Sequence, residues 1–89
     1  MVILRAGNET ATSADQSITP ETPFSSVSLI NSGSNLITYA IGGTVTDATT
    51  AARVIALPGG ASFSMDLRGD RLSYQAASNT TFSYVLATA

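Results

Sequence analysis

Apolar and polar residues alternate along much of the chain, and the alternation is clearest from Phe24 onward. In FSSVSLI, Val27 and Leu29 face one way while the serines beside them face the other, and LITYAI resumes the same period at residues 36–41. A period of two residues is typical of half-buried strands. NSGSN, at residues 31–35, supplies the Asn, Gly and Ser of a tight connection, so the two runs are predicted to form a hairpin.

The second half of the chain repeats this pattern. RVIAL, at residues 53–57, leads to the turn signal PGG, and ASFSMDL, RLSYQA and TTFSYVLA each alternate apolar with polar residues. TVTDATTAA, at residues 44–52, fits a short edge strand, a crossing loop or both. Strands separated by turn signals at intervals of about 8 to 12 residues predict an all-β fold. We expect an antiparallel β-sandwich or jelly-roll-like barrel of roughly six to eight short strands with an irregular N-terminal arm.

The N-terminal part of the chain gives a weaker signal. MVIL is a short apolar run, but Gly7 to Ser17 has neither strand nor helix spacing. That segment is predicted to be an irregular arm, either disordered in isolation or docked on a neighbouring subunit. The chain is accordingly divided into an N-terminal strand and arm, residues 1–23, and a sandwich domain, residues 24–89. Partner contacts are predicted for Val2, Ile3, Leu4, Arg5, Asn8, Glu9 and Asp15.

Composition limits what such a domain does. Of the 89 residues, 44% are hydrophobic and only 11% are charged, with a net charge of −2. Basic residues are not clustered beyond Arg68 and Arg71, so no electrostatic field attracts nucleic acid, and no nucleic-acid partner is expected. Charge normally keeps small domains apart. A surface this poor in charge is therefore expected to pack against neighbouring subunits.

Compartment and cross-linking are constrained by what the sequence lacks. Without cysteine, no disulfide supplements the core, so burial and oligomerisation must stabilise the fold. No apolar run approaches the roughly 20 residues that span a bilayer, and MVILRAGNET does not have the regions of a signal peptide. The expectation is a protein that stays soluble where it is made and has no membrane partner.

Candidate chemistry is sparse. Histidine is absent as well as cysteine, which removes the commonest general base, metal ligand and thiol nucleophile. Asp66 and Asp70, next to Arg68 and Arg71, are expected to form surface ion pairs across a hairpin rather than a catalytic carboxylate pair. The calcium candidate TDATT, at residues 46–50, offers a single carboxylate. No catalytic residue, metal or cofactor is predicted.

Two further features invite a binding role. Tyr39, Tyr74 and Tyr84 would suit a platform for a sugar ring, but each lies on the apolar face of its strand and is expected in the core or an interface. The tripeptide Arg68-Gly69-Asp70, familiar from integrin ligands, sits between two strands. Gly69 fits a short connection that needs positive φ or close backbone approach, so a structural turn is predicted rather than an adhesion site.

The region from Phe24 to Ala87 contains, in this order, SVSLINSGSNLITYAIGG, a small-residue loop and ALPGGASFSMDLRGDRLSYQAASNTTFSYVLA. The order and spacing of these segments give a resemblance to the small β-sandwich virion proteins of tailed bacteriophages. It implies a non-enzymatic capsid cement or decoration protein, located on the virion surface and made in the host cytoplasm. It also implies the major capsid protein as partner and a homotrimer.

Two functions from different classes remain open at this point. A cement protein bridges neighbouring capsid subunits through many weak contacts repeated by symmetry, with residues 1–5 and the arm extending onto a neighbour. The alternative is a carbohydrate- or receptor-binding module of a phage fibre or head appendage. Exposed tyrosines favour the alternative, and buried tyrosines favour cement.

Overall fold

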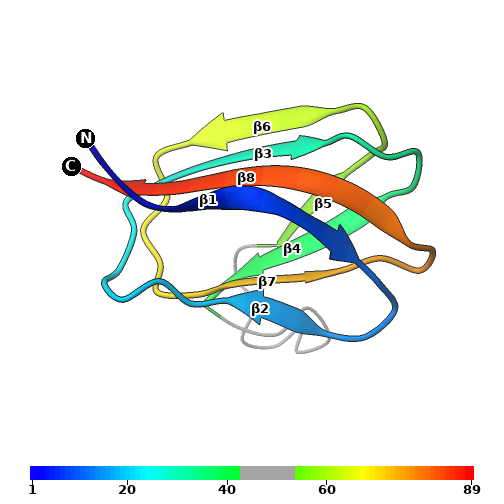
Figure 1. Cartoon of the computed structure of the whole chain (residues 1–89), viewed down its shortest axis with the longest axis horizontal. Helices are drawn as coiled ribbons and strands as arrows, with labels where there is room; N and C mark the ends of the chain where they lie inside the picture. Colours follow the sequence, from blue (N-terminus) through cyan, green and yellow to red (C-terminus); the bar gives the residue numbers. More distant parts are fainter. Residues whose placement is uncertain (43–53) are drawn as a thin grey trace.

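The computed structural model describes residues 1–42 and 54–89; the undecided stretch at residues 44–52 and the calcium candidate lie outside the described residues. Every regular element in the described part is a strand (Figure 1). The strands are β1 (Val2–Ala11), β2 (Gln16–Ile18), β3 (Ser26–Asn31), β4 (Ile37–Ile41), β5 (Val54–Leu57), β6 (Ser62–Met65), β7 (Leu72–Gln75) and β8 (Thr80–Thr88). The predicted all-β fold is confirmed.

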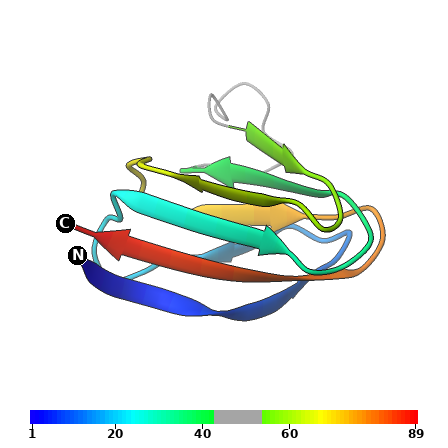
Figure 2. The same ribbon diagram turned by 90° about the horizontal axis from the view of Figure 1, so that it is seen from above.

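The strands form two antiparallel sheets of four, in the orders β1-β8-β3-β6 and β2-β7-β4-β5. The pairs β1 with β8, β2 with β7, β3 with β6 and β4 with β5 are those of one long antiparallel ribbon. Two further pairs, β3 with β8 and β4 with β7, roll this ribbon into two layers. This is the strand order of a jelly roll, and Figure 2 shows the first sheet with its strands side by side.

Apart from β4, which is followed by β5 in the same sheet, each strand is followed by a strand of the opposite sheet. The two predicted hairpins are therefore wrong, because β3 and β6 lie in the first sheet while β4 and β7 lie in the second. Alternation indicates which residues face the core. The same alternation results whether the next strand in the chain is a hydrogen-bonded neighbour or lies in the opposite sheet. A short connection alone does not choose between these arrangements.

The buried side chain of Asn31 holds the crossing between β3 and β4. Its amide nitrogen donates to the carbonyl oxygens of Asn35, at 2.7 Å, and Leu57, at 2.9 Å. Its amide oxygen accepts from the backbone N–H of Gly33, at 3.1 Å, and from the hydroxyl of Thr80, at 3.2 Å. These bonds satisfy polar groups that the crossing would otherwise leave buried and unpaired, so the chain changes sheets within a few residues.

The N-terminal segment also differs from prediction. Gly7 to Ala11 continue β1, which pairs with β8 from Val2 opposite Thr88 to Ala11 opposite Thr80, and Gln16 and Ser17 belong to β2. An edge strand needs few apolar side chains, because its inward positions lie at the rim of the core. Most of β1 is exposed, so the apolar period that marks the central strands is missing.

The core lies between the two sheets and is centred on aromatic residues. Phe82 packs edge-on against Tyr39, with ring centroids 5.4 Å apart, and against Tyr74 at 4.8 Å. Tyr84 lies 6.1 Å from the same ring. The aliphatic residues buried around them include Val27, Leu29, Ile37, Leu57, Leu72 and Leu86. The opposite face of the first sheet points away from this core.

Candidate functional site

The outer face of the first sheet is made of uncharged and mostly small side chains, of which serine is the commonest. Strand register places these residues together: Ser28 lies opposite both Ser64 and Val85, and Ser83 lies opposite both Ile30 and Asn8. The Ser28 and Ser64 hydroxyls are 3.0 Å apart, and the Ser83 hydroxyl donates to Asn8 at 2.6 Å. We call this set the serine-rich face: Ala6, Asn8, Thr10, Ser26, Ser28, Ile30, Ser62, Ser64, Thr81, Ser83 and Val85.

No member of the serine-rich face carries a charge. Short side chains on a sheet leave a shallow relief, and hydroxyl groups both donate and accept hydrogen bonds. Such a face can pack closely on another neutral surface without the desolvation cost of buried charges. None of its members is a histidine or carboxylate that would act as a general base and activate these hydroxyls as nucleophiles. Single outward serines looked unremarkable in the sequence, and only the strand register brings them onto one surface.

Six of the seven predicted partner-binding residues lie on β1, and Asp15 lies exposed between β1 and β2. Val2 and Ile3 are each 57% exposed, whereas Leu4 is partly buried against the core. The polar ones, Arg5, Asn8 and Glu9, are exposed residues of a strand rather than members of a free arm. Their contacts with a partner stay a prediction.

The two ends of the chain lie side by side (Figure 1), with Val2 opposite Thr88. Met1, Ser25, Ser26, Asp66 and Ala89 line a hollow at this end of the molecule. Met1 and Ile3 expose apolar surface nearby. The N-terminal residues therefore remain available for contact even though β1 belongs to the sandwich.

Arg68-Gly69-Asp70 lies in the connection between β6 and β7, as predicted, although this connection crosses between sheets. Gly69 exchanges two backbone hydrogen bonds with Phe24, of 2.8 and 3.1 Å. A Cβ on Gly69 would lie 2.9 Å from the Phe24 ring and would also overlap the side chain of Ile41. Close approach, and not positive φ, requires the glycine here. Arg68 and Asp70 are exposed on either side.

The three tyrosines are buried, as the sequence predicts: Tyr39 is 0% exposed, Tyr74 3% and Tyr84 5%. They do not form a platform for a sugar. Burial, and to a smaller extent Tyr74, raises the pKa of the Tyr39 phenol well above its usual range. Burial is also the largest cause of a raised pKa at Tyr74, and the charge of Glu9 and the nearby Tyr84 raise this pKa further. Within the described residues, the Tyr39 hydroxyl has no hydrogen-bond partner.

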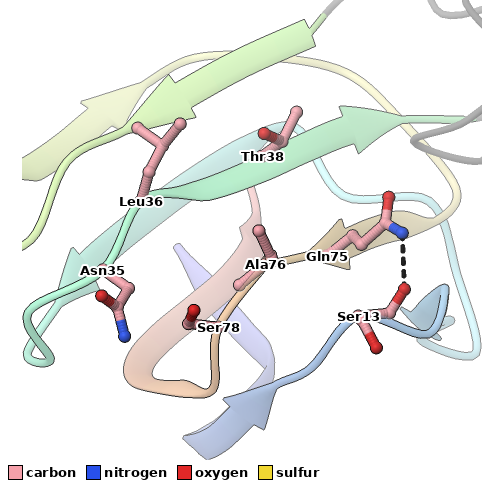
Figure 3. A pocket seen from close by; sticks show the side chains of 8 residues that line it. Ser13, Asn35, Leu36, Thr38, Gln75, Ala76 and Ser78 are labelled. Carbon is pink, nitrogen blue, oxygen red and sulfur yellow. Dashed lines mark hydrogen bonds between the residues drawn. The ribbon is translucent and has the colours of Figure 1, made fainter.

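A hollow of about 440 Å³ opens at one end of the second sheet (Figure 3). It is lined by Leu36, the residue before β4, by Thr38 of β4 and by Gln75 of β7. The Gln75 amide is held by the carbonyl oxygen of Ser13, to which it donates at 2.6 Å. With no aromatic or charged side chain on its walls, the hollow lacks the groups that stack on or ion-pair with a ligand.

Reactive clusters are equally missing from the part of the chain that the structure covers. Residues 1–42 and 54–89 hold no group of three or more His, Cys, Asp or Glu side chains that would bind a metal. Nor do they form a helix that would cross a bilayer. Asp66 and Asp70 are not on facing strands of a hairpin, so the predicted cross-hairpin geometry is wrong; ion pairing with Arg68 and Arg71 stays a prediction.

Comparison with known proteins gives a likeness in fold. No family model and no curated protein matches the chain. It is similar to a chain in a solved structure of Bacillus endospore appendages, which are described there as a novel family of disulfide-linked pili. The TM-score is 0.63 at 21% sequence identity, over 92% of this chain and 80% of that one. The resemblance to phage virion proteins is thus supported as far as a small β-sandwich, and its capsid role stays a prediction.

Proposed function

We propose that this chain is a non-enzymatic structural subunit that packs onto other subunits in a repeating surface assembly. The observation that carries the proposal is the serine-rich face, because a sheet face without charge is unusual on a free domain and suits burial against a neutral protein surface. The exposed apolar residues at the start of β1 add contacts near one end of this face.

The specific form of the proposal is a capsid decoration protein on the surface of a bacteriophage head. In this role the serine-rich face lies against the major capsid protein, and the subunit bridges neighbouring copies of it. Each contact is weak, but contacts repeated by symmetry add their free energies and resist displacement together. A homotrimer at a symmetric junction fits this role and is part of the proposal.

A second candidate is a subunit of an appendage filament, which the likeness in fold to the Bacillus endospore appendages favours. Those appendages are described as disulfide-linked, and this chain contains no cysteine. A filament of this chain would therefore have to be held by sheet pairing and packing alone. A sugar-binding role is not favoured, because the tyrosines that would stack on a sugar are buried.

Co-sedimentation with phage heads that lack the protein tests the proposal. We expect the protein to sediment at a fixed ratio to the major capsid protein and the double variant Ser28→Arg/Ser83→Arg to lose binding. Two arginines would place unpaired charges in the buried contact, each costing several kcal/mol. Ser17→Arg, an exposed position on β2 in the other sheet, is the matched control and should still bind. Binding of the double variant as tight as that of the unchanged protein would contradict the role of this face.

A further inference from the structure

Strand β1 is the longest edge strand in the part of the chain that the structure describes. It has 10 residues, whereas the other edge strands, β2, β5 and β6, have 3 or 4. Among residues 1–42 and 54–89, β1 pairs only with β8, and Figure 2 shows it along the border of the first sheet. Its outer side therefore presents backbone N–H and C=O groups in the geometry that accepts another strand.

The charges of β1 are arranged symmetrically. Arg5 and Glu9 are its charged residues, and each is two positions from Gly7. The irregularity in the register with β8 lies between Ile3 and Arg5, so pairing from Arg5 to Ala11 is regular. Arg5 and Glu9 consequently point to the same side of the sheet, and both side chains are exposed.

We propose that β1 pairs antiparallel with β1 of a second copy, about a twofold axis at Gly7. In this register Arg5 of each copy lies opposite Glu9 of the other, so that two opposite-charge pairs form on one side of the sheet. Ala6 lies opposite Asn8, and at the axis itself the two glycines bring no side chains to clash. A second copy is the occupant that fits, because the charges of this edge are complementary to the same edge reversed.

Charged residues and bulges on an edge strand often serve to prevent pairing. Charges of one sign would do so here, since two copies would place like charges opposite each other. In the twofold register Arg5 and Glu9 instead place opposite charges across from each other, and no two like charges face each other. The edge is therefore selective for one register of self-pairing rather than closed to it.

The pairing would join the first sheets of two copies into one, in the order β6-β3-β8-β1-β1-β8-β3-β6. A twofold axis perpendicular to this sheet keeps both serine-rich faces on the same side. The dimer would thus present one continuous uncharged face of twice the area. In this respect the inference rests on the structural role proposed above, with the twofold dimer in place of the homotrimer as the unit that binds.

Sedimentation velocity over rising protein concentration, up to about 1 mM, tests the pairing. We expect the unchanged protein to dimerise and both Arg5→Glu and Glu9→Arg to raise the dissociation constant about tenfold or more, because each creates like-charge pairs. An equimolar mixture of the two variants should dimerise again, since a chain with Glu at 5 and 9 faces a chain with Arg at both. Asp70→Arg and Arg71→Glu make the same changes of net charge away from β1 and should dimerise as the unchanged protein does.

Three results would overturn the pairing: a monomer throughout this concentration range, single variants that dimerise undiminished, or a mixture no tighter than its separate components. Circular dichroism checks that each variant is folded, which exposed positions should permit. Ser28→Arg/Ser83→Arg, which tests the proposed function, lies off the β1 edge and should dimerise normally. Loss of particle binding with dimerisation intact, or the reverse, therefore shows which of the two proposals fails.

Discussion

Replacing Gly69 by alanine places a methyl group where two buried side chains already lie. The added Cβ would be 2.9 Å from the Phe24 ring and closer still to the Cγ2 atom of Ile41. Phe24 is 0% exposed and Ile41 is 6% exposed, so neither moves aside without disturbing the core. Overpacking of this kind costs about 1 to 3 kcal/mol, and the lower backbone entropy of unfolded alanine returns about 0.4 to 1 kcal/mol.

These terms span a net loss of about 0 to 2.6 kcal/mol. Because the added Cβ overlaps two buried side chains, we expect about 1 to 2 kcal/mol, which for a domain of this size lowers the Tm by roughly 5 to 15 °C. Thermal unfolding followed by circular dichroism measures it. Gly7→Ala is the matched control, because its Cβ would meet Tyr84 at 3.6 Å, an ordinary contact, and its Tm should stay the same or rise slightly. Equal Tm values for Gly69→Ala and the unchanged protein would refute the close packing on which this interpretation of the tripeptide depends.

The remaining predictions concern the buried polar groups. Asn31→Ala removes four hydrogen bonds and leaves buried partners unpaired, so we expect the free energy of unfolding, measured in urea, to fall by about 3 to 5 kcal/mol. Asn35→Ala at the same connection is the control and should cost about 1 kcal/mol or less. Equal losses would contradict the central role of Asn31. Tyr39→Phe removes a buried hydroxyl that has no hydrogen-bond partner among residues 1–42 and 54–89, and it should stabilise the fold by about 1 kcal/mol. Because folding raises the pKa of Tyr39, ionisation of this phenol favours the unfolded chain. The free energy of unfolding is therefore unaffected by Tyr39 ionisation below pH 10 and falls as the pH rises above 10. Alkaline unfolding that is identical in Tyr39→Phe and the unchanged protein would contradict that linkage.

Alternation of apolar and polar residues located most of the central strands. The runs around Leu29, Tyr39, Phe63, Tyr74 and Phe82 all became strands, since inward side chains of a sandwich must be apolar at every second position. The N-terminal strand was predicted, but its continuation from Gly7 to Ala11 was missed because most residues of β1 are exposed: at an edge, Arg5 and Glu9 occupy inward-pointing positions without being buried. Burial, not strand geometry, produces the period.

Strand partners were harder to predict than strands. The connections at Asn31 and Gly69 are short and rich in turn residues, yet both pass from one sheet to the other. Hydrogen bonds hold each of them: those of the Asn31 side-chain amide in the first, and those between the Gly69 and Phe24 backbones in the second. The outer surface was harder still. Ser28, Ser64 and Ser83 are far apart in the sequence, and only the pairing of β3 with β6 and β8 makes them neighbours.

β1 also changes what truncation can show. Removing residues up to Ser17 would delete β1 and most of β2, one strand from each sheet, and would expose the edge of β8. Such a truncation is therefore expected to destabilise the sandwich itself. Substitutions at exposed positions separate assembly from folding, which the loss of two strands cannot do.

Electron cryomicroscopy of phage heads incubated with the protein tests directly whether the serine-rich face binds the capsid. We expect jelly-roll density repeated by the symmetry of the head, with the serine-rich face of β1, β8, β3 and β6 turned toward the capsid surface. Bare heads at saturating protein, or bound subunits whose serine-rich face points to solvent, would contradict it.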